Sequence, residues 1–397
     1  MRKIAVLLIC LYITGCTALK ALDESVKGMQ DYLMGGEDNT EPPHELVVYP
    51  PEIAIKLLWK HQIGVGFDEQ YLKLVPALGY GKVVAVDREG LVQARNAKTG
   101  ALSWSVETGL LISGGPGIGS ETVIIGSSNA QIVALNINTG EELWRSQASS
   151  EVLSVPRVEQ GVVLIRTSDG KELALRESTG ETLWEFVKNV PALSIRGTGS
   201  PIVVDDNVIS GYANGKMVAL RLKDGRNVWE TSIAIPKGRS EVERLVDLDV
   251  DPIESDGVIY VASYQGGVTA VMASDGDVLW RNEDISSYTG LSYDWRYLYL
   301  SDSESDVWQL DQRNGSVLWK QKDLHQRKLS APVAYDNYVV VGDLEGYVHW
   351  LATSDGRQLG RLQITDDAIE AQPVVVDNIV YVYARDGTLA ALKASPL

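Results

Sequence analysis

The stretch Thr139-Gly140-Glu141-Glu142-Leu143-Trp144 decides the fold, because copies of it recur along the chain. One copy runs from Thr99-Gly100 to Trp104 and another from Thr179-Gly180 to Trp184, so these three copies are spaced 40 residues apart. A fixed period of this kind is the signature of a repeat architecture. Looser copies continue the series: Asp224-Gly225 to Trp229, Asp275-Gly276 to Trp280, Asn314-Gly315 to Trp319, and Asp355-Gly356 to Gly360.

A second motif, a turn followed by an alternating strand, precedes each copy. Asp169-Gly170 leads to Ala174-Leu175, Asn214-Gly215 leads to Ala219-Leu220, and the motif occurs eight times in all. Such turns between alternating runs are strong hairpin signals, and four short strands in about 40 residues are typical of a propeller blade. We therefore predict an all-β fold, an eight-bladed β-propeller of four-stranded blades over residues 51–397.

The two ends of the repeat region complete one another. The eighth repeat ends at Leu397 without its last strand, whereas the strand-like run from Ile53 to Trp59 has no repeat before it. We predict that this N-terminal strand completes the last blade, which closes the ring and removes an exposed sheet edge. Gly360 stands where a tryptophan is expected, so we predict a weaker contact between blades there.

The recurring tryptophans are predicted to be structural. A large apolar indole can pack between neighbouring blades while its N–H reaches a loop carbonyl. None of them is followed by aspartate, so the dipeptide typical of WD40 propellers is missing. The residues concerned are Trp59, Trp104, Trp144, Trp184, Trp229, Trp280 and Trp319.

The N-terminus has the pattern of a secretory signal. Arg2 and Lys3 precede a short apolar run that ends at small residues. The stretch from Ile13 to Cys16 resembles the bacterial lipobox, in which the cysteine is acylated, so we predict a signal peptide over residues 1–15 and lipidation of Cys16. Thr17, and not aspartate, follows it, which favours the periplasmic face of the outer membrane. The polar, proline-rich residues 16–50 are predicted to be a flexible tether.

Composition excludes several other functions. The formal net charge is −17, which repels a phosphate backbone and argues against a nucleic acid partner. Cys10 and Cys16 are the only cysteines, so the repeat region has no disulfide or cysteine-based metal site. The four histidines are scattered and no nucleophile–base pair stands out, so we predict no catalysis, no metal and no cofactor.

Two alternatives to a plain scaffold stay open. The repeat resembles that of quinoprotein dehydrogenases, eight-bladed propellers that bind pyrroloquinoline quinone and calcium, but the cysteine pair of their alcohol-oxidising branch is missing here. A periplasmic ligand-binding propeller would line its axial mouth with aromatic residues. Trp295, Trp308 and Trp350 lie outside the repeat positions and are the candidates, although we expect them to fill the core.

The lipobox, the tether and the eight repeats together are similar to the BamB family, lipoprotein propellers of the outer-membrane barrel-assembly (Bam) machinery. The resemblance spans the whole chain. Its most specific stretches are residues 191–197 between repeats three and four and residues 244–252 between repeats four and five. Residues 346–351 also match the seventh repeat of the family.

This resemblance implies a non-catalytic scaffold that assists the folding and insertion of β-barrel proteins. In the family the two connections hold BamA through its periplasmic (POTRA) domains, which makes Leu193, Ile195, Arg196, Asp247 and Asp249 the predicted contact residues. Leu193 and Ile195 are alternatively the inner face of a strand, and Arg196 is alternatively paired with Asp247 or Asp249. Nascent barrels are possible direct partners through β-augmentation, but short, protected blade edges favour a role in positioning BamA.

Overall fold

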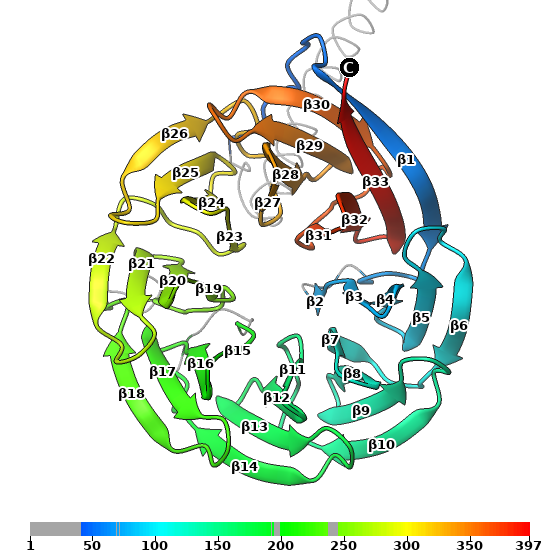
Figure 1. Cartoon of the computed structure of the whole chain (residues 1–397), viewed down its shortest axis with the longest axis vertical. Coiled ribbons are helices and arrows are strands. Elements are labelled where there is room, and N and C mark those ends of the chain that lie inside the picture. Colours follow the sequence, from blue (N-terminus) through cyan, green and yellow to red (C-terminus); the bar gives the residue numbers. More distant parts are fainter. Residues whose placement is uncertain (1–40, 69, 71, 192, 194–198, 237–244) are drawn as a thin grey trace, which may run out of the picture. The chain divides into compact units, whose positions relative to one another are not determined.

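Eight antiparallel sheets stand around a central axis (Figure 1). This computed structural model describes residues 41–397 except 69, 71, 192, 194–198 and 237–244, and residues 43–397 form one compact unit. The predicted eight-bladed β-propeller is therefore confirmed. Among the described residues we find no helix with the length and apolar character needed to span a bilayer.

The blades follow one another in chain order, each from its inner to its outer strand. Blade 1 holds β3 (Ala77–Gly79), β4 (Lys82–Val86), β5 (Leu91–Asn96) and β6 (Leu102–Glu107). Blade 2 holds β7 (Ile112–Ile118), β8 (Thr122–Ser127), β9 (Gln131–Asn136) and β10 (Glu142–Gln147). Blade 3 holds β11 (Arg157–Glu159), β12 (Val162–Arg166), β13 (Lys171–Arg176) and β14 (Thr182–Val187). Blade 4 holds β15 (Ile202–Val204), β16 (Asn207–Gly211), β17 (Lys216–Arg221) and β18 (Asn227–Ser232).

The second half of the ring repeats this order. Blade 5 holds β19 (Ile253–Ser255), β20 (Val258–Ser263), β21 (Gly267–Met272) and β22 (Val278–Asn282). Blade 6 holds β23 (Leu291–Tyr293), β24 (Tyr297–Ser301), β25 (Val307–Asp311) and β26 (Val317–Gln321). Blade 7 holds β27 (Val333–Tyr335), β28 (Tyr338–Gly342), β29 (Tyr347–Ala352) and β30 (Gln358–Gln363). Blade 8 holds β31 (Val374–Val376), β32 (Ile379–Tyr383) and β33 (Thr388–Pro396), completed by β1 (Ile53–Gln62).

The ring closes as predicted, but one blade has more strands than predicted. Strand β1 pairs antiparallel with β33, from Ile53 opposite Pro396 to Gln62 opposite Thr388, so the predicted closure is confirmed. Blade 2 departs from the predicted four strands, because the two-residue strand β2 (Lys73–Leu74) pairs in parallel with β7 and makes a fifth. Strand β2 lies at the inner side of the ring, next to the axis (Figure 1).

The repeated tryptophans join each blade to the next. Each of the seven indole nitrogens donates a hydrogen bond of 2.7–3.0 Å to a backbone carbonyl of the following blade. The turn glycine of the following blade lies against the same ring: a Cβ added to Gly140, whose φ is +77°, would come within 2.7 Å of Trp104. The Thr-Gly and Trp positions of the motif thus meet across each of these interfaces.

The seam between blades 7 and 8 is built differently. No turn glycine faces Gly360 there, because β33 and β1 come from opposite ends of the chain. Instead Ile53 and Ile55 lie against Gly360, and a Cβ added to that glycine would come within 2.9 Å of Ile53. Glu52 adds an ion pair to Arg357 and a backbone hydrogen bond to Leu359. The expected tryptophan is thus replaced by isoleucines from the other end of the chain.

A β-bulge interrupts the outer strand of every blade. In each sheet the register between the third strand and the outer strand shifts just before the tryptophan position, as between Glu142 and Trp144 of β10. The bulge leaves Leu143 exposed and turns Trp144 inward. Because bulges twist and blunt an edge strand, these outer edges are poor templates for further strands.

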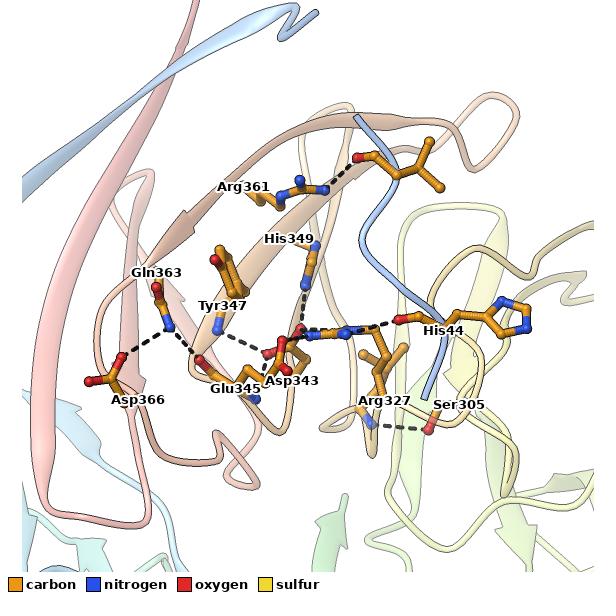
Figure 2. A network of polar contacts seen from close by, with 12 residues as sticks. His44, Ser305, Arg327, Asp343, Glu345, Tyr347, His349, Arg361, Gln363 and Asp366 are labelled. Carbon is orange, nitrogen blue, oxygen red and sulfur yellow. Dashed lines mark hydrogen bonds and ion pairs between the residues drawn. The ribbon is translucent and has the colours of Figure 1, made fainter. Parts of the chain in front are cut away.

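Residues 43–52, which we call the N-terminal strap, lie along blade 7 (Figure 2). The amide of His44 donates to the carbonyl of His325, and Arg327 donates to the carbonyl of His44, both at 3.0 Å. Arg361 donates to the carbonyl of Val47 at 2.9 Å and lies over the ring of Tyr49. The compact unit therefore begins at Pro43, eight residues before the boundary expected at residue 51.

A buried polar network holds the strap in place (Figure 2). Arg327 donates to Asp343 at 2.9 Å, and the same carboxylate contacts His349 Nε2 at 2.9 Å. Burial alone would raise the pKa of Asp343, but His349 and the charge of Arg327 bring it below its ordinary value. Asp343 is thus kept ionised beneath the strap, where it fixes the guanidinium that contacts His44.

Candidate binding surface at the blade connections

The predicted contact residues that the structure describes lie on one face of the ring. In a blade of four antiparallel strands, the connection to the next blade lies at the same end as the turn between the second and third strands. All these connections therefore share one face, which we call the connection face. Of the predicted contacts, Leu193, Asp247 and Asp249 are among the described residues, whereas Ile195 and Arg196 lie outside them.

Leu193 and the two aspartates differ in exposure. Leu193 is 42% exposed, so its side chain is accessible on the connection between blades 3 and 4. Asp247 is only 2% exposed, and its side chain lies inside the connection between blades 4 and 5. Burial raises the pKa of Asp249 to about 7, the charge of Asp247 adds to this, and Arg166 and Lys73 oppose it. The aspartates therefore lie mostly beneath the surface, whereas Leu193 is exposed on it.

Asp251 joins the two connections. Its carboxylate accepts a hydrogen bond from the amide of Ser200, near the end of the connection between blades 3 and 4. The same carboxylate pairs with Lys73 of β2, which is 178 residues away in the sequence. A single side chain thus ties together the extra strand of blade 2 and both connections that carry the predicted contacts.

A buried cluster at the ends of the neighbouring strands supports these connections. It consists of Arg166, Glu172 and Tyr212. Arg166, at the end of β12, donates to the carbonyls of Gly199 at 3.1 Å and of Gly211, and lies 4.3 Å from the ring centre of Tyr212. Glu172 accepts hydrogen bonds from Tyr212 at 2.7 Å and from Ser210 at 3.0 Å. Burial raises the pKa of Glu172, while the charge of Arg166 opposes the shift.

Sequence reasoning missed this supporting cluster, although the sequence holds a weak signal for it. Arg166 ends an otherwise apolar strand, and Glu172 takes an inward position on an alternating one. Charged residues are almost never fully buried unless they are paired, so their positions point to a buried pair. Which groups pair with them depends on the fold, and the sequence pattern does not supply it.

The connection face opens into a cavity of about 590 Å³ near the axis. Its walls come from β2, from the connections that enter blades 3, 5, 6 and 8, and from a turn of blade 5. Most of the lining surface is apolar, and two tyrosines and a group of carboxylates also contribute to it. The lining includes Leu72, Leu74, Val75, Leu153, Leu245, Val250, Ile253, Leu291, Ala371, Tyr264, Tyr288, Asp247, Asp249, Asp251, Glu370 and Lys73.

The three tryptophans outside the repeat positions do not line this cavity. Trp350 is fully buried and donates to the hydroxyl of Tyr335 at 3.1 Å, and Trp308 is partly buried and donates to Asp302 at 2.7 Å. Trp295 is 83% exposed, so the expectation that it fills the core is wrong. It follows Asp294 in the turn between β23 and β24, with the guanidinium of Arg296 5.9 Å from the centre of its ring.

One group of side chains in the described part of the chain has the spacing of metal ligands: Glu304, Asp306 and His325. The ammonium of Lys320 lies 2.5 Å from one oxygen of Asp306, and His325 Nδ1 lies 2.8 Å from the other. The buried carboxylate is therefore already neutralised by a cation of the protein itself.

The comparisons with known proteins agree with one another. The family model described as outer membrane protein assembly factor BamB matches residues 88–321 and 310–395. Proteins of that name are 47% identical in Pseudomonas aeruginosa over 88% of this chain and 92% of the relative, and 44% identical in Legionella pneumophila over 99% of each.

Solved structures add the fold. The crystal structure of BamB from Moraxella catarrhalis superposes with a TM-score of 0.77 at 26% identity, over 86% of this chain and 100% of the other. A quinohemoprotein alcohol dehydrogenase from Comamonas testosteroni gives a TM-score of 0.65 at 14% identity, over 85% and 76% of the chains, and shares the fold alone. By sequence and by architecture, the chain belongs to the BamB family of outer membrane protein assembly factors.

Proposed function

We propose that this chain is a non-catalytic scaffold lipoprotein of the outer-membrane β-barrel assembly machinery, and that it binds the periplasmic POTRA domains of BamA. Membership of the BamB family supports this function. The observation that carries the binding site is the carboxylate of Asp251, which joins the connection of residues 245–251 to Ser200 and to Lys73 of β2. These contacts fix the described part of the surface, on which Leu193 is exposed.

The anchor is part of the same proposal. Acylation of Cys16 after removal of residues 1–15 places the propeller at the periplasmic face of the outer membrane, on a tether that reaches to residue 42. Replacing Cys16 with serine is expected to abolish labelling with radioactive palmitate and to move the protein out of the outer-membrane fraction. Labelling that persists in the serine variant contradicts the assignment of the anchor.

The mode of assistance is positioning of BamA. Strand addition to nascent β-barrel proteins needs an open, regular edge, but the outer strand of each blade carries a bulge. On blade 7 the strap also covers the edge. Its Glu52 amide donates to the carbonyl of Leu359, and its Val47 carbonyl accepts from Arg361. Direct contact with nascent barrel proteins is therefore less well supported than the positioning of BamA.

A binding experiment tests the surface. The full-length protein and its Leu193→Glu and Arg196→Ala variants are used to capture the soluble periplasmic region of BamA. The matched control is Leu102→Glu, because Leu102 is similarly exposed but lies on the outer strand of blade 1. We expect capture by the wild type and the control, and a loss of at least about tenfold in affinity for the two variants, since contacts at the centre of an interface dominate its energy.

Each outcome has a clear meaning. Circular dichroism first shows that every variant is folded. If both variants bind as tightly as the wild type, the surface is elsewhere on the ring. If the wild type itself does not bind BamA, the assignment of the partner is wrong.

A further inference from the structure

The connection face carries a second feature besides the predicted contacts, the axial cavity of about 590 Å³. We propose that this cavity is a socket for a basic, amphipathic segment of the protein partner, an apolar side chain that enters together with a neighbouring lysine or arginine. This inference rests on the proposed function in taking the partner to be a protein that docks on the connection face.

The size of the cavity fits side chains and not a folded element. Pockets of about 300–1,000 Å³ are typical of sites for small ligands, and an α-helix with its side chains is about 10 Å across. A cavity of about 590 Å³ therefore accepts one or two side chains of a partner whose backbone stays at the mouth.

The walls are apolar and preformed. Leu74, Leu153 and Leu291 are each less than 10% exposed, and they come from β2, from the connection into blade 3 and from blade 6. Because these positions belong to different blades of a closed ring, their spacing is fixed by the fold. An entering aliphatic or aromatic side chain loses contact with water without requiring the walls to move, which is what a preorganised site provides.

The charge of the lining selects a cation. Four carboxylates line the cavity, those of Asp247, Asp249, Asp251 and Glu370, and Lys73 is the only lysine or arginine among the lining residues. Lys73 is already engaged with Asp251. Because the pKa of Asp249 is about 7, this carboxyl is only partly ionised at neutral pH, but the lining still carries more negative than positive charge. This charge disfavours phosphate groups and acidic peptides and favours an ammonium or guanidinium group, which would also stabilise the ionised form of Asp249.

Two of these carboxylates are poorly solvated in the free protein. Oδ2 of Asp249 is buried and has no hydrogen-bond partner among the described residues. Burial also raises the pKa of Glu370, with Asp367 adding to the shift and Arg385 and Lys328 opposing it. A buried carboxylate without a full set of partners is costly, so a cation that enters the cavity gains more than it would at the exposed rim.

The wall far from the predicted contacts offers the sharpest test. Glu370 precedes blade 8 and Tyr288 precedes blade 6, and neither belongs to the two connections of residues 191–200 and 245–251. Asp284 and Tyr293 are matched controls, because both are exposed, lie close to blade 6 in the sequence and do not line the cavity.

The experiment measures the affinity of the full-length protein for the soluble periplasmic region of BamA by titration calorimetry at low and high salt. We expect Glu370→Gln and Tyr288→Ala to weaken binding about tenfold, and Glu370→Gln also to reduce the salt dependence, since truncating one partner of a buried charge pair has large effects. Asp284→Asn and Tyr293→Ala are expected to change the affinity less than about twofold.

A second arm tests the chemistry of the occupant directly. The peptide acetyl-Gly-Leu-Arg-Leu-Gly-amide is titrated against the wild type and Glu370→Gln, with acetyl-Gly-Leu-Glu-Leu-Gly-amide as its acidic counterpart. We expect the basic peptide to bind the wild type at least about tenfold more tightly than the acidic one, and to lose this advantage in Glu370→Gln.

The failures of the two proposals can be told apart. If Leu193→Glu abolishes BamA binding while Glu370→Gln and Tyr288→Ala bind normally, the scaffold function stands and the socket is wrong. If neither peptide binds and octylammonium alone does, the cavity is a site for free amines and the protein occupant is wrong. If BamA does not bind the wild type but the basic peptide does, the partner is wrong and the socket stands.

Discussion

At the scale of single residues, three aspartates in one alternating run have three different environments. Asp247 is buried inside the connection, Asp249 is partly buried beside the cavity, and Asp251 is paired with Lys73 and with the amide of Ser200. The sequence pattern treats the three residues alike, because the alternation alone does not say which carboxylate meets Lys73 of β2.

Asp249 gives a pH-dependent prediction. Its pKa is about 7 in the folded protein, against an ordinary value of 3.8, so the unfolded chain releases this proton at a lower pH than the native protein. The stability associated with this group is therefore complete below about pH 4 and is lost as the pH rises to about 7. We expect Asp249→Asn, measured by urea denaturation, to match the wild type at pH 4 and to be more stable by ~2–4 kcal/mol at pH 8.

The control for this prediction is Asp224→Asn, on an exposed turn of blade 4. Its stability should follow that of the wild type across the whole pH range. Parallel curves for Asp249→Asn and the wild type would show that Asp249 is ionised in the native protein at neutral pH.

Two glycines separate backbone strain from packing. Gly140 and Gly161 have the same φ of +77°, but an added Cβ at Gly140 meets the ring of Trp104 at 2.7 Å, whereas at Gly161 it meets nothing within 4 Å. We expect Gly161→Ala to lower the free energy of unfolding by about 1–2 kcal/mol, the cost of a left-handed alanine. Gly140→Ala should cost at least about 1 kcal/mol more, because a rigid indole is in the way. Equal losses in urea denaturation would contradict the role of the glycine in the interface between blades.

At the scale of elements, the strap converts the edge of blade 7 from an open strand into a covered one. In blades 1 to 6 the outer strand exposes the two residues directly before the tryptophan position, but in β30 Gln358 and Leu359 are both buried. The reason is the hydrogen bonding of Glu52 and Val47 to this strand. The strap is therefore an element of the fold, although it has no regular secondary structure.

Arg361 is the side chain whose loss should loosen the strap. Arg361→Ala removes the hydrogen bond to Val47 and the contact with Tyr49. We expect amide hydrogen exchange over residues 46–52 to become at least about tenfold faster, because few other contacts protect this segment, while exchange in β33 stays unchanged. Arg226→Ala is the control, since the side chain of Arg226 is 76% exposed and pairs only with Asp224 among the described residues. Unchanged exchange in Arg361→Ala would mean that the strap is held mainly by Arg327 and His44.

The elements show where sequence reasoning succeeds and where it stops. The blades follow from the sequence because every strand, turn glycine and tryptophan recurs with the same period, and the tryptophans and glycines contact one another across blades. Strand β2 was missed because two residues, Lys73 and Leu74, carry no alternation. The strap was missed because its composition is that of a linker, and its contacts are made by arginines of distant repeats to backbone carbonyls. The cluster of Arg166 and Glu172 likewise depends on partners that only the fold brings together.

At the scale of the whole molecule, the ring is closed by the two ends of the chain, and the seam tests this closure. Ile53 is buried against Gly360, while Leu57 of the same strand is 42% exposed. We expect Ile53→Asp to lower the free energy of unfolding by at least about 3 kcal/mol, since it buries an unpaired charge, and to promote association through the edge of β33. Leu57→Asp should stay within about 1 kcal/mol of the wild type in urea denaturation and elute as the wild type in size-exclusion chromatography. Equal effects of the two variants would show that the seam does not govern closure.

The connection face brings the proposed functions together. It carries Leu193, the mouth of the cavity and the connection through His325 and Arg327 to which the strap is bound. His44, close to the start of the compact unit, is therefore bound on the same face that is proposed to meet BamA. None of this geometry follows from the repeat alone, since the repeat is the same in every blade and the asymmetry comes from its departures.

The strap also has a mechanical consequence. Tension applied at residue 43 reaches Arg327 and Arg361 before it reaches β1, because the strap lies between residue 43 and the closing strand. The force is thus carried first by blade 7. The nine residue pairs that join β1 to β33 bear it only after the strap has detached. When the propeller is pulled at residue 43, the contacts of the strap with Arg327 and Arg361 break first, and the ring stays closed.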